Sequence, residues 1–206
     1  LNQFKKTILK NTKKYKFVIV CGGGKTARNY IQGLENQNIK NTKLLQSHLG
    51  ISTTRLNARF MTNFFGKDAN KGVPKNMKEI NSLLRKSNVV FCGALRYSPN
   101  QTSDSTTAKL ANYFNSKFIN LTNVKGLYDK NPKKFPSAKF IPEISHKEFY
   151  KQATKTKFQP GQHFILDQTA AKLIKKYKIK TYILGQDTKQ LDNLLNDKHF
   201  VGTEIK

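Results

Sequence analysis

The chain has 206 residues, with 38 Lys and Arg against 12 Asp and Glu, and a formal net charge of +26. This length suffices for one domain with a substantial core, so we expect residues 1–206 to form a single domain. We expect neither a membrane span nor a signal peptide, because no apolar run approaches the required length. Cys21 and Cys92 each close an apolar run, which favours two buried free thiols in a cytoplasmic protein.

The positive charge is spread along the chain rather than gathered in one tail. Lysine accompanies abundant Asn and Ile, a combination typical of coding bias toward A/T-rich codons. We therefore favour a solvated, compositionally biased surface over a dedicated nucleic-acid face, although phosphate ligands would still be attracted. Arginine is more informative, because its planar fork has uses that lysine cannot supply. There are five: Arg28, Arg55, Arg59, Arg85 and Arg96.

The N-terminal stretch predicts an amphipathic helix over residues 1–12, followed by a buried strand over Phe17–Cys21. Three glycines, Gly22 to Gly24, then lead into a helix over Thr26–Gly33. A strand, a glycine turn and a helix start in this order favour an anion site, because several N–H groups converge at the helix N-terminus. Arg28, one turn into the helix, could reach back toward phosphate oxygens.

Two nucleotide-binding fingerprints do not fit this turn. A Walker A loop needs a glycine where Ile19 stands, and the third glycine of a Rossmann fingerprint would fall at Ala27. A plain tight turn without a ligand is the simpler interpretation. Three consecutive glycines are costly for a plain turn, so we favour the anion site.

The next elements alternate between helix and strand. Residues 44–65 have helical periodicity, and the expected apolar stripe is Leu45, Leu49, Leu56, Phe60 and Phe64. Met77–Ser87 predicts a short helix and Val89–Cys92 a second buried strand. The loop Gly93–Asp104 follows, and Ser103 or Asp104 should cap a helix over residues 105–115.

The remaining residues continue the alternation. The expected strands are Phe118–Thr122, Thr181–Leu184 and Val201–Ile205. The expected helices are 145–150, with a Ser145–Glu148 capping box, 168–177, capped by Asp167, and 191–195. The helix 168–177 should bury a stripe of Ala170, Ala171 and Ile174, and residues 154–161 are expected to form a linker. Short apolar strands between helices favour a parallel sheet covered on both faces. The glycine turn, the 93–104 loop and the 122–126 loop would then share the carboxyl edge of that sheet.

Four segments, in order and correctly spaced, carry a resemblance to a known family. They are VCGGGKTARNYI, LGISTTRLNA, TNVKGLYDKNPKKFPSAK and ILDQTAAKLI. Together they resemble the amino acid kinase superfamily, and within it the archaeal-type UMP kinases. The resemblance runs from about Phe4 to the final VGTEI. It implies an α/β fold, a three-layer αβα sandwich around a mainly parallel sheet, and transfer of the γ-phosphoryl group of ATP to UMP with Mg²⁺ assisting.

The resemblance also implies roles for individual residues. The UMP-binding set would be Gly22, Gly23, Ser47, Tyr97, Ser98, Pro99, Asn100, Gln101, Thr102 and Ser103. The ATP-binding set would be Gly24, Arg28, Thr122, Asn123, Tyr128 and Asn131. Lys25, Arg28 and Asp104 would order and neutralise the transferred phosphoryl group, and none of these residues is expected to be a resident metal ligand. A homo-oligomer, a hexamer in this family, is implied in the same way.

The sequence also departs from the family pattern. Ser47 stands where the family has a ribose-binding aspartate, Lys125 replaces an aspartate, and Asn131 precedes Pro132 in place of another aspartate. The 93–104 loop carries two extra residues, which we place at Leu95 and Arg96. We expect the chain to begin after the family's first strand and its Gly-Gly-Ser turn, which would leave a gap in the sheet.

Three functions remain open at this point. The first is a UMP kinase, which the four ordered motifs favour. The second is a sister kinase of the same fold acting on another phosphate or a carboxylate, which the altered 93–104 loop could indicate. The third is a non-catalytic nucleotide- or RNA-binding remnant, which the net charge and the departures from the family pattern favour.

Overall fold

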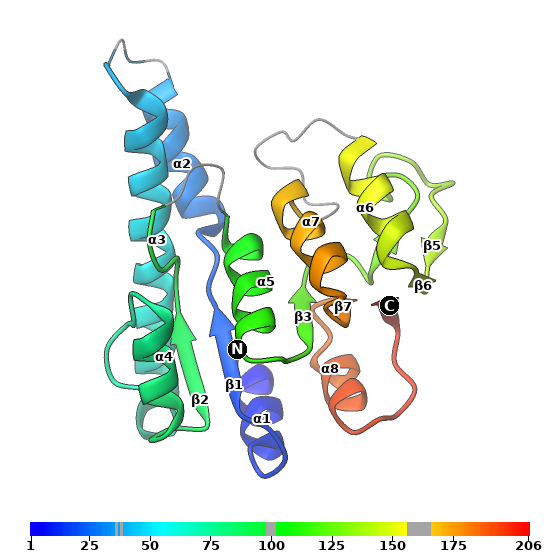
Figure 1. The fold of residues 1–206 in the computed structure, drawn as a ribbon, viewed down its shortest axis with the longest axis horizontal. Coiled ribbons are helices and arrows are strands. Elements are labelled where there is room, and N and C mark those ends of the chain that lie inside the picture. Colours follow the sequence, from blue (N-terminus) through cyan, green and yellow to red (C-terminus); the bar gives the residue numbers. More distant parts are fainter. Residues whose placement is uncertain (36, 38, 98–101, 156–165) are drawn as a thin grey trace. The chain divides into compact units, whose positions relative to one another are not determined.

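The computed structural model describes residues 1–35, 37, 39–97, 102–155 and 166–206 (Figure 1). The chain divides into two compact units, the first made of Leu1–Thr7 with Thr107–Lys206 and the second of Ile8–Thr106. Helices α1 (Asn2–Asn11) and α5 (Ser103–Tyr113) contribute residues to both units. Whether the chain behaves as one domain in solution stays a prediction.

The second unit is built around two parallel strands. β1 (Phe17–Val20) pairs with β2 (Val89–Cys92) in a register that places Phe17 beside Val89 and Val20 beside Cys92. The helical elements of this unit are α2 (Gly24–Glu35), α3 (Thr42–Phe65), a 3₁₀ turn η1 (Gly66–Asp68) and α4 (Met77–Leu84). α3 and α4 pack on β2, and α2 packs along α3. All these elements were predicted apart from the 3₁₀ turn.

The two strands differ in their surroundings. All four residues of β2 are buried, and Asn70 occupies its outer edge by accepting from the Phe91 N–H at 2.7 Å and donating to the Phe91 carbonyl at 3.1 Å. β1 is half-buried along its whole length, so the prediction of a buried strand was wrong for it. Within the described residues each of these strands has a strand partner on one edge only, but Asn70 covers the outer edge of β2, and β1 is the more open of the two.

The apolar stripe predicted for α3 was also wrong. The residues that α3 buries are Thr53, Thr54, Ala58, Thr62 and Phe65. Leu56 and Phe60, members of the predicted stripe, are 59% and 55% exposed, and Leu45 is also exposed. The helix packs with small threonine and alanine side chains because β2 and the residues after it lie close to its backbone. Its larger apolar side chains consequently cover much of the opposite, outward face.

The first unit contains a mixed four-stranded sheet in the order β3-β7-β8-β6. Its strands are β3 (Phe118–Leu121), β7 (Thr181–Leu184), β8 (Gly202–Ile205) and β6 (Glu143–Ile144). β3 runs parallel to β7 and β6 parallel to β8, whereas β7 and β8 are antiparallel. A separate hairpin pairs β4 (Leu127–Tyr128) with β5 (Phe140–Ile141). The α/β class with mainly parallel pairing is confirmed, although β4, β5 and β6 were not foreseen.

Three helices complete this unit, and the start signals predicted for two of them were correct. α7 (Gln168–Tyr177) is capped by Asp167, whose carboxylate accepts from the Thr169 and Ala170 N–H groups at 2.8 and 3.0 Å. α6 (His146–Lys155) begins at the predicted Ser145–Glu148 capping box and extends into the stretch expected to be linker. α8 (Thr188–Leu195) is capped by Asp187 and begins three residues before the predicted helix, for which no cap was named. Ala170, Ala171 and Ile174 are fully buried, as predicted.

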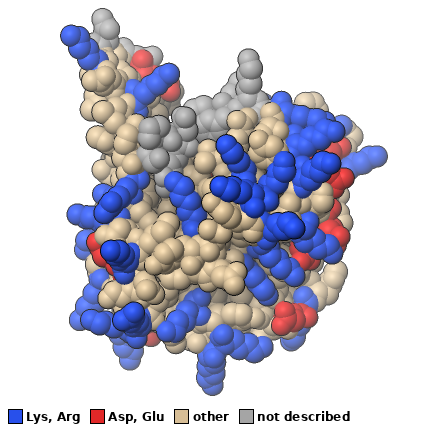
Figure 2. All heavy atoms as spheres, in the orientation of Figure 1, with Lys and Arg blue, Asp and Glu red and all other residues tan. Residues whose placement is uncertain are grey.

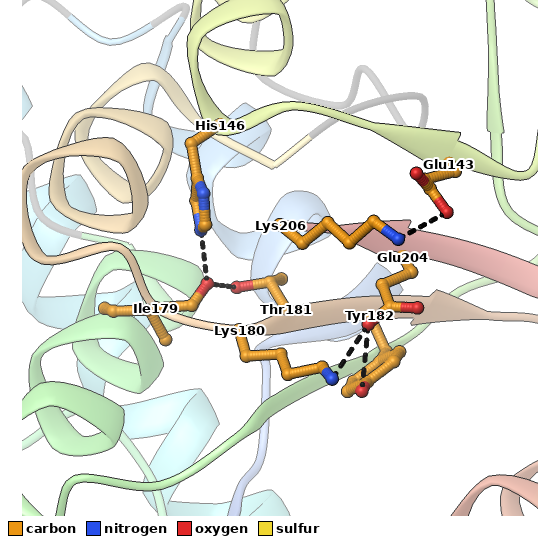
Figure 3. Close-up of polar contacts among 8 residues, drawn as sticks. All are labelled: Glu143, His146, Ile179, Lys180, Thr181, Tyr182, Glu204 and Lys206. Atoms are coloured by element: carbon orange, nitrogen blue, oxygen red, sulfur yellow. Dashed lines mark hydrogen bonds and ion pairs between the residues drawn. The ribbon is translucent and has the colours of Figure 1, made fainter.

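Polar contacts join the C-terminal strands of this unit (Figure 3). Lys180 pairs with Glu204 at 3.0 Å, and Lys206 pairs with Glu143 at 2.8 Å. The hydrogen bond to Glu204 raises the pKa of Lys180, so this amine stays charged. The carbonyl of Ile179 accepts from the Thr181 hydroxyl and lies 3.0 Å from His146 Nε2. These groups are engaged in structural contacts and leave the site to be sought elsewhere.

None of the helices in the described ranges carries an apolar stretch long enough to cross a lipid bilayer.

Candidate functional site

The glycine turn directly follows β1 and opens α2. Gly24, the first residue of the helix, has φ 61°, a backbone conformation that favours glycine. Gly23 is packed tightly, because a Cβ built on it would lie 2.5 Å from the Ala27 Cβ. The same Cβ would lie 3.8 Å from both the Gly50 carbonyl and the Thr54 methyl of α3. Two of the three glycines are therefore required by the backbone conformation or by close packing.

The turn presents backbone donors to solvent. Within the described part of the chain, the N–H groups of residues 23–26 have no hydrogen-bond partner, as is usual for the first turn of a helix. Lys25 and Arg28 are exposed beside them. Unpaired N–H groups, the positive end of the helix dipole and two cations together suit an anion such as a phosphate.

Asn57 of α3 fixes the orientation of the glycine turn. Its side-chain amide donates to the Gly22 carbonyl oxygen at 2.7 Å. Asn57, Thr54 and Gly50 lie at positions i+7, i+4 and i of one helix, so they share a face of α3. That face therefore carries these three contacts between α3 and the turn.

A second loop begins at Gly93, after β2, and α3 holds its first residues. The Ala94 N–H donates to the Thr54 hydroxyl at 2.9 Å, and the Ala94 carbonyl accepts from Arg55 Nε at 3.0 Å. The second arm of the Arg55 guanidinium donates to the Leu95 carbonyl. Gly93 lies so close to α3 that a Cβ on it would be 2.6 Å from the backbone nitrogen of Arg55. The predicted extra residue Leu95 is thus buried and anchored.

The far end of this loop meets the glycine turn at the start of α5. A Cβ on Gly22 would lie 3.6 Å from the Ser103 hydroxyl. The cap of α5 is Thr102, whose hydroxyl accepts from the Asp104 and Ser105 N–H groups at 3.1 and 3.3 Å. The prediction of Ser103 or Asp104 as the cap was wrong, because the helix begins earlier than the periodicity indicated. Both residues instead lie in the first turn of α5.

Of the other residues predicted on the acceptor side, the structure describes Ser47 and Tyr97. Tyr97 is 44% exposed, and its ring meets His48 edge-on at a centroid distance of 5.6 Å. The hydroxyl of Ser47 donates to the Lys43 carbonyl within α3 at 2.8 Å, which leaves its oxygen able to accept. The predicted residues Ser98, Pro99, Asn100 and Gln101 lie outside the described residues.

The residues predicted to hold the ATP nucleoside lie together in the first unit. Thr122 and Asn123 follow the carboxyl end of β3, and the Thr122 N–H donates to the Leu184 carbonyl at 2.8 Å. Tyr128 lies in β4, where its ring packs edge-on against Phe140 at 5.5 Å. The Asn131 side-chain oxygen accepts from the Lys133 N–H at 2.9 Å, so it stabilises a local turn. The predicted ATP set is therefore divided, with Gly24 and Arg28 in the second unit and the other four residues in the first.

Three functional candidates in α3 were missed when site residues were assigned from the sequence. Thr54, Arg55 and Asn57 contact loop backbone, and none was assigned to a site. One signal could have found Arg55, since arginine is scarce in this chain and all five arginines fall in the second unit. Asn57, like Arg55, lies in the segment LGISTTRLNA that carries the family resemblance, so that segment was the signal for it, although it gives the residue no role.

The distribution of Lys, Arg, Asp and Glu between the two units does not indicate a second site. The second unit has 17 Lys and Arg against four acidic residues, and the first has 21 against eight, so both are similarly basic. Figure 2 shows these cations distributed over the visible face. Cys21 and Cys92 are free thiols, and burial raises the pKa of each to about 12. Both thiols are therefore neutral near pH 7 and unsuited to nucleophilic chemistry.

Comparison with known proteins identifies relatives for this arrangement. The sequence model of the amino acid kinase family matches residues 1–185. A uridylate kinase from Thermococcus kodakarensis is 31% identical over 194 residues, covering 93% of this chain and 84% of that protein. The crystal structure of uridylate kinase from Archaeoglobus fulgidus matches with a TM-score of 0.85 at 31% identity, covering 99% of this chain and 91% of that one. An isopentenyl phosphate kinase structure, at 14% identity and TM-score 0.66 over 100% and 90% of the two chains, shows a likeness of fold alone.

The contact between Gly93 and α3 can be tested with a matched pair of glycine substitutions. We expect Gly93→Ala to lower the free energy of unfolding by about 1–3 kcal/mol, because the new methyl group meets backbone atoms that cannot move aside. Gly33→Ala, in open space on α2, should leave the stability unchanged or raise it by up to about 1 kcal/mol. Urea unfolding measures both. Equal effects of the two substitutions would show that the loop does not pack on α3.

Proposed function

The chain belongs to the amino acid kinase family, and we propose on that premise that it transfers the γ-phosphoryl group of ATP to UMP. An oxygen of the UMP phosphate would form the new bond to the γ-phosphorus. The bond from that phosphorus to the β–γ bridging oxygen would break, and ADP would leave with the electron pair. The products are UDP and ADP.

One observation carries this proposal. The glycine turn, with its unpaired N–H groups, lies beside Ser103 at the end of the second loop, within a single unit. The chain is also 31% identical to a uridylate kinase over 194 residues. The turn therefore supplies a phosphate site next to the loop expected to bind the acceptor.

Phosphoryl transfer needs positioning and charge neutralisation more than a covalent catalyst. In this proposal Gly22 and Gly23 bind the acceptor phosphate, while Gly24 and Arg28 contact the phosphates of ATP. Lys25 and Arg28 neutralise the charge that develops on the transferred group. Asp104, in the first turn of α5, orders these cations.

The remaining assignments concern binding rather than chemistry. Ser47, Tyr97, Thr102 and Ser103 would contact UMP on the acceptor side. Thr122, Asn123, Tyr128 and Asn131 would hold the ATP nucleoside. Lys125, exposed in the same loop as Thr122, replaces the family's aspartate and would add a cation near the nucleotide.

Magnesium would enter with the nucleotide rather than occupy a site of its own. Over the ranges that the structure describes, no group of three or more His, Cys, Asp or Glu side chains is placed to hold a metal ion. An ion that keeps several waters and binds substrate phosphates fits such a surface. When bound, it would supply further neutralisation of phosphate charge. We also propose a cytoplasmic location, which is consistent with the two free thiols.

We further propose that the chain forms a homo-oligomer through the outward face of α3, which comprises Leu45, Leu56 and Phe60. All three side chains are exposed. No lysine occurs between Lys43 and Lys67, although lysine is the commonest charged residue of the chain. Because each copy carries a net charge of +26, two copies can approach most favourably across such an apolar face without lysine.

Acceptor competition tests the proposed activity. With ATP and Mg²⁺ present, we expect UMP to be phosphorylated with a kcat/KM at least on the order of tenfold above that of CMP or isopentenyl phosphate, because a site built to hydrogen-bond one base rejects others. Coupled detection of ADP, with UDP identified by chromatography, measures this. Preference for another acceptor would favour the sister-kinase alternative. Nucleotide binding without turnover of any acceptor would contradict an enzymatic role.

Light scattering at several protein concentrations tests the assembly. We expect Leu56→Glu to shift the protein toward monomer, because a carboxylate would be buried in the contact between copies. Val201→Glu, which introduces the same charge at a residue 41% exposed in the other unit, serves as the control and should assemble normally. Assembly of Leu56→Glu at wild-type concentrations would exclude this face.

A further inference from the structure

Helix α3 contacts both loops of the acceptor side through three neighbouring residues. We propose that Asn57 and Arg55 are positioning residues, which hold the glycine turn and the second loop in the geometry needed to bind an acceptor phosphate. This inference rests on the proposed function for the identity of the acceptor. The contacts themselves are part of the fold, so they can be tested whether or not the chain turns over UMP.

The first arm of the argument concerns the peptide between Gly22 and Gly23. Its carbonyl oxygen accepts from the Asn57 amide at 2.7 Å. A peptide group is planar and trans, so its C=O and N–H point in opposite directions. Holding the Gly22 carbonyl toward α3 therefore directs the Gly23 N–H away from α3. Without that hold, three flexible glycines could turn the carbonyl toward the phosphate, where two partial negative charges would repel.

The second arm concerns the backbone that leaves β2. Both polar groups of Ala94 are bonded to α3, its N–H to the Thr54 hydroxyl and its carbonyl to Arg55 Nε. The other arm of the Arg55 fork reaches the Leu95 carbonyl. A guanidinium can donate to two successive carbonyl oxygens in a fixed geometry, and an ammonium cannot reproduce that fork. This accounts for an arginine at position 55 in a chain that otherwise uses lysine.

The two arms are mechanically linked because their residues are close along the helix. Thr54 and Asn57 are three residues apart, a rise of about 4.5 Å. Gly23 also packs against Gly50 and Thr54, so the turn cannot slide along α3 independently of the second loop. A shift of α3 would move both loops together. The spacing between the phosphate-binding turn and the acceptor loop is thus set by one rigid element.

A positioning role makes a prediction that a merely stabilising role does not. If Asn57 orients N–H groups toward the phosphate, its loss should weaken ligands only through their phosphate. UMP and uridine share the base and the ribose and differ in that group. We therefore compare the affinities of the two ligands by isothermal titration calorimetry, with inorganic phosphate as a third probe.

Asn57→Leu is the decisive variant, because it keeps the approximate size of the side chain, adds no charge beside the phosphate and removes the donor. We expect UMP affinity to fall on the order of tenfold while uridine affinity is unchanged. Asn81→Leu, which makes the same change at an exposed position of α4, is the matched control and should bind UMP as wild type does. Equal weakening of UMP and uridine by Asn57→Leu would overturn the positioning role of Asn57.

Arg55→Lys tests the other arm, with Arg59→Lys as its control at an exposed position one turn away. We expect Arg55→Lys to raise the KM for the acceptor several-fold, on the order of fivefold, and to leave the KM for ATP unchanged, because only the acceptor loop is released. A parallel rise in both KM values, or no change in either, would overturn the assignment of Arg55 to this loop.

Hydrogen exchange separates this inference from the proposed function. In the protein without ligand, Asn57→Leu should speed exchange of the Ala27 amide, which donates to the Gly23 carbonyl at 3.1 Å, relative to wild type and to Asn81→Leu, while core strand β2 stays protected. If the wild-type chain turned over no acceptor, the proposed function would fail, and this result would still support the hold on the turn. Unchanged exchange at Ala27 would overturn the inference even for an active kinase.

Discussion

The hydrogen bond from the Asn57 amide to the Gly22 carbonyl is the contact on which the site depends. Glycine gives the turn the freedom to bring its backbone close to an anion, but that freedom must be restricted before the turn can bind. The restriction comes from α3, a helix whose buried face consists of threonine, alanine and a single phenylalanine. Small side chains let the helix approach the turn and the second loop closely enough to bond their backbones.

The same helix explains two features of the chain that composition leaves unexplained. One is the use of arginine at position 55, where the fork bonds two carbonyl groups. The other is the difference between the two faces of α3: the inner face hydrogen-bonds the backbone of both loops, whereas the outer face exposes the apolar side chains of Leu56 and Phe60. If copies of the chain meet on that outer face, the contact would lie directly behind the residues that position the acceptor loops.

The sequence predicted most helices and strands because their start signals are local. Asp167, Ser145 and the apolar run Val89–Cys92 each lie where the structure has a cap or a strand. The α3 stripe was misjudged because periodicity assumes that large side chains are buried, and here close backbone packing demanded small ones. The short strands β4 and β6 were not predicted, because a strand of two residues has no periodic pattern to detect. The turn was identified from its glycines, but its support was missed, because the LGISTTRLNA segment includes Asn57 without indicating its partner, which lies 35 residues away in sequence.

The central claim is that the glycine turn, held by Asn57, is the phosphate site. Titration of isotopically labelled protein with UMP, followed by amide NMR, tests it most directly. The account predicts that the Gly23 and Gly24 amide signals move on binding, while the Asn57 side-chain amide, already bonded to Gly22, stays in place. Binding of UMP that left both glycine amides unmoved, or that released the Asn57 amide, would contradict it.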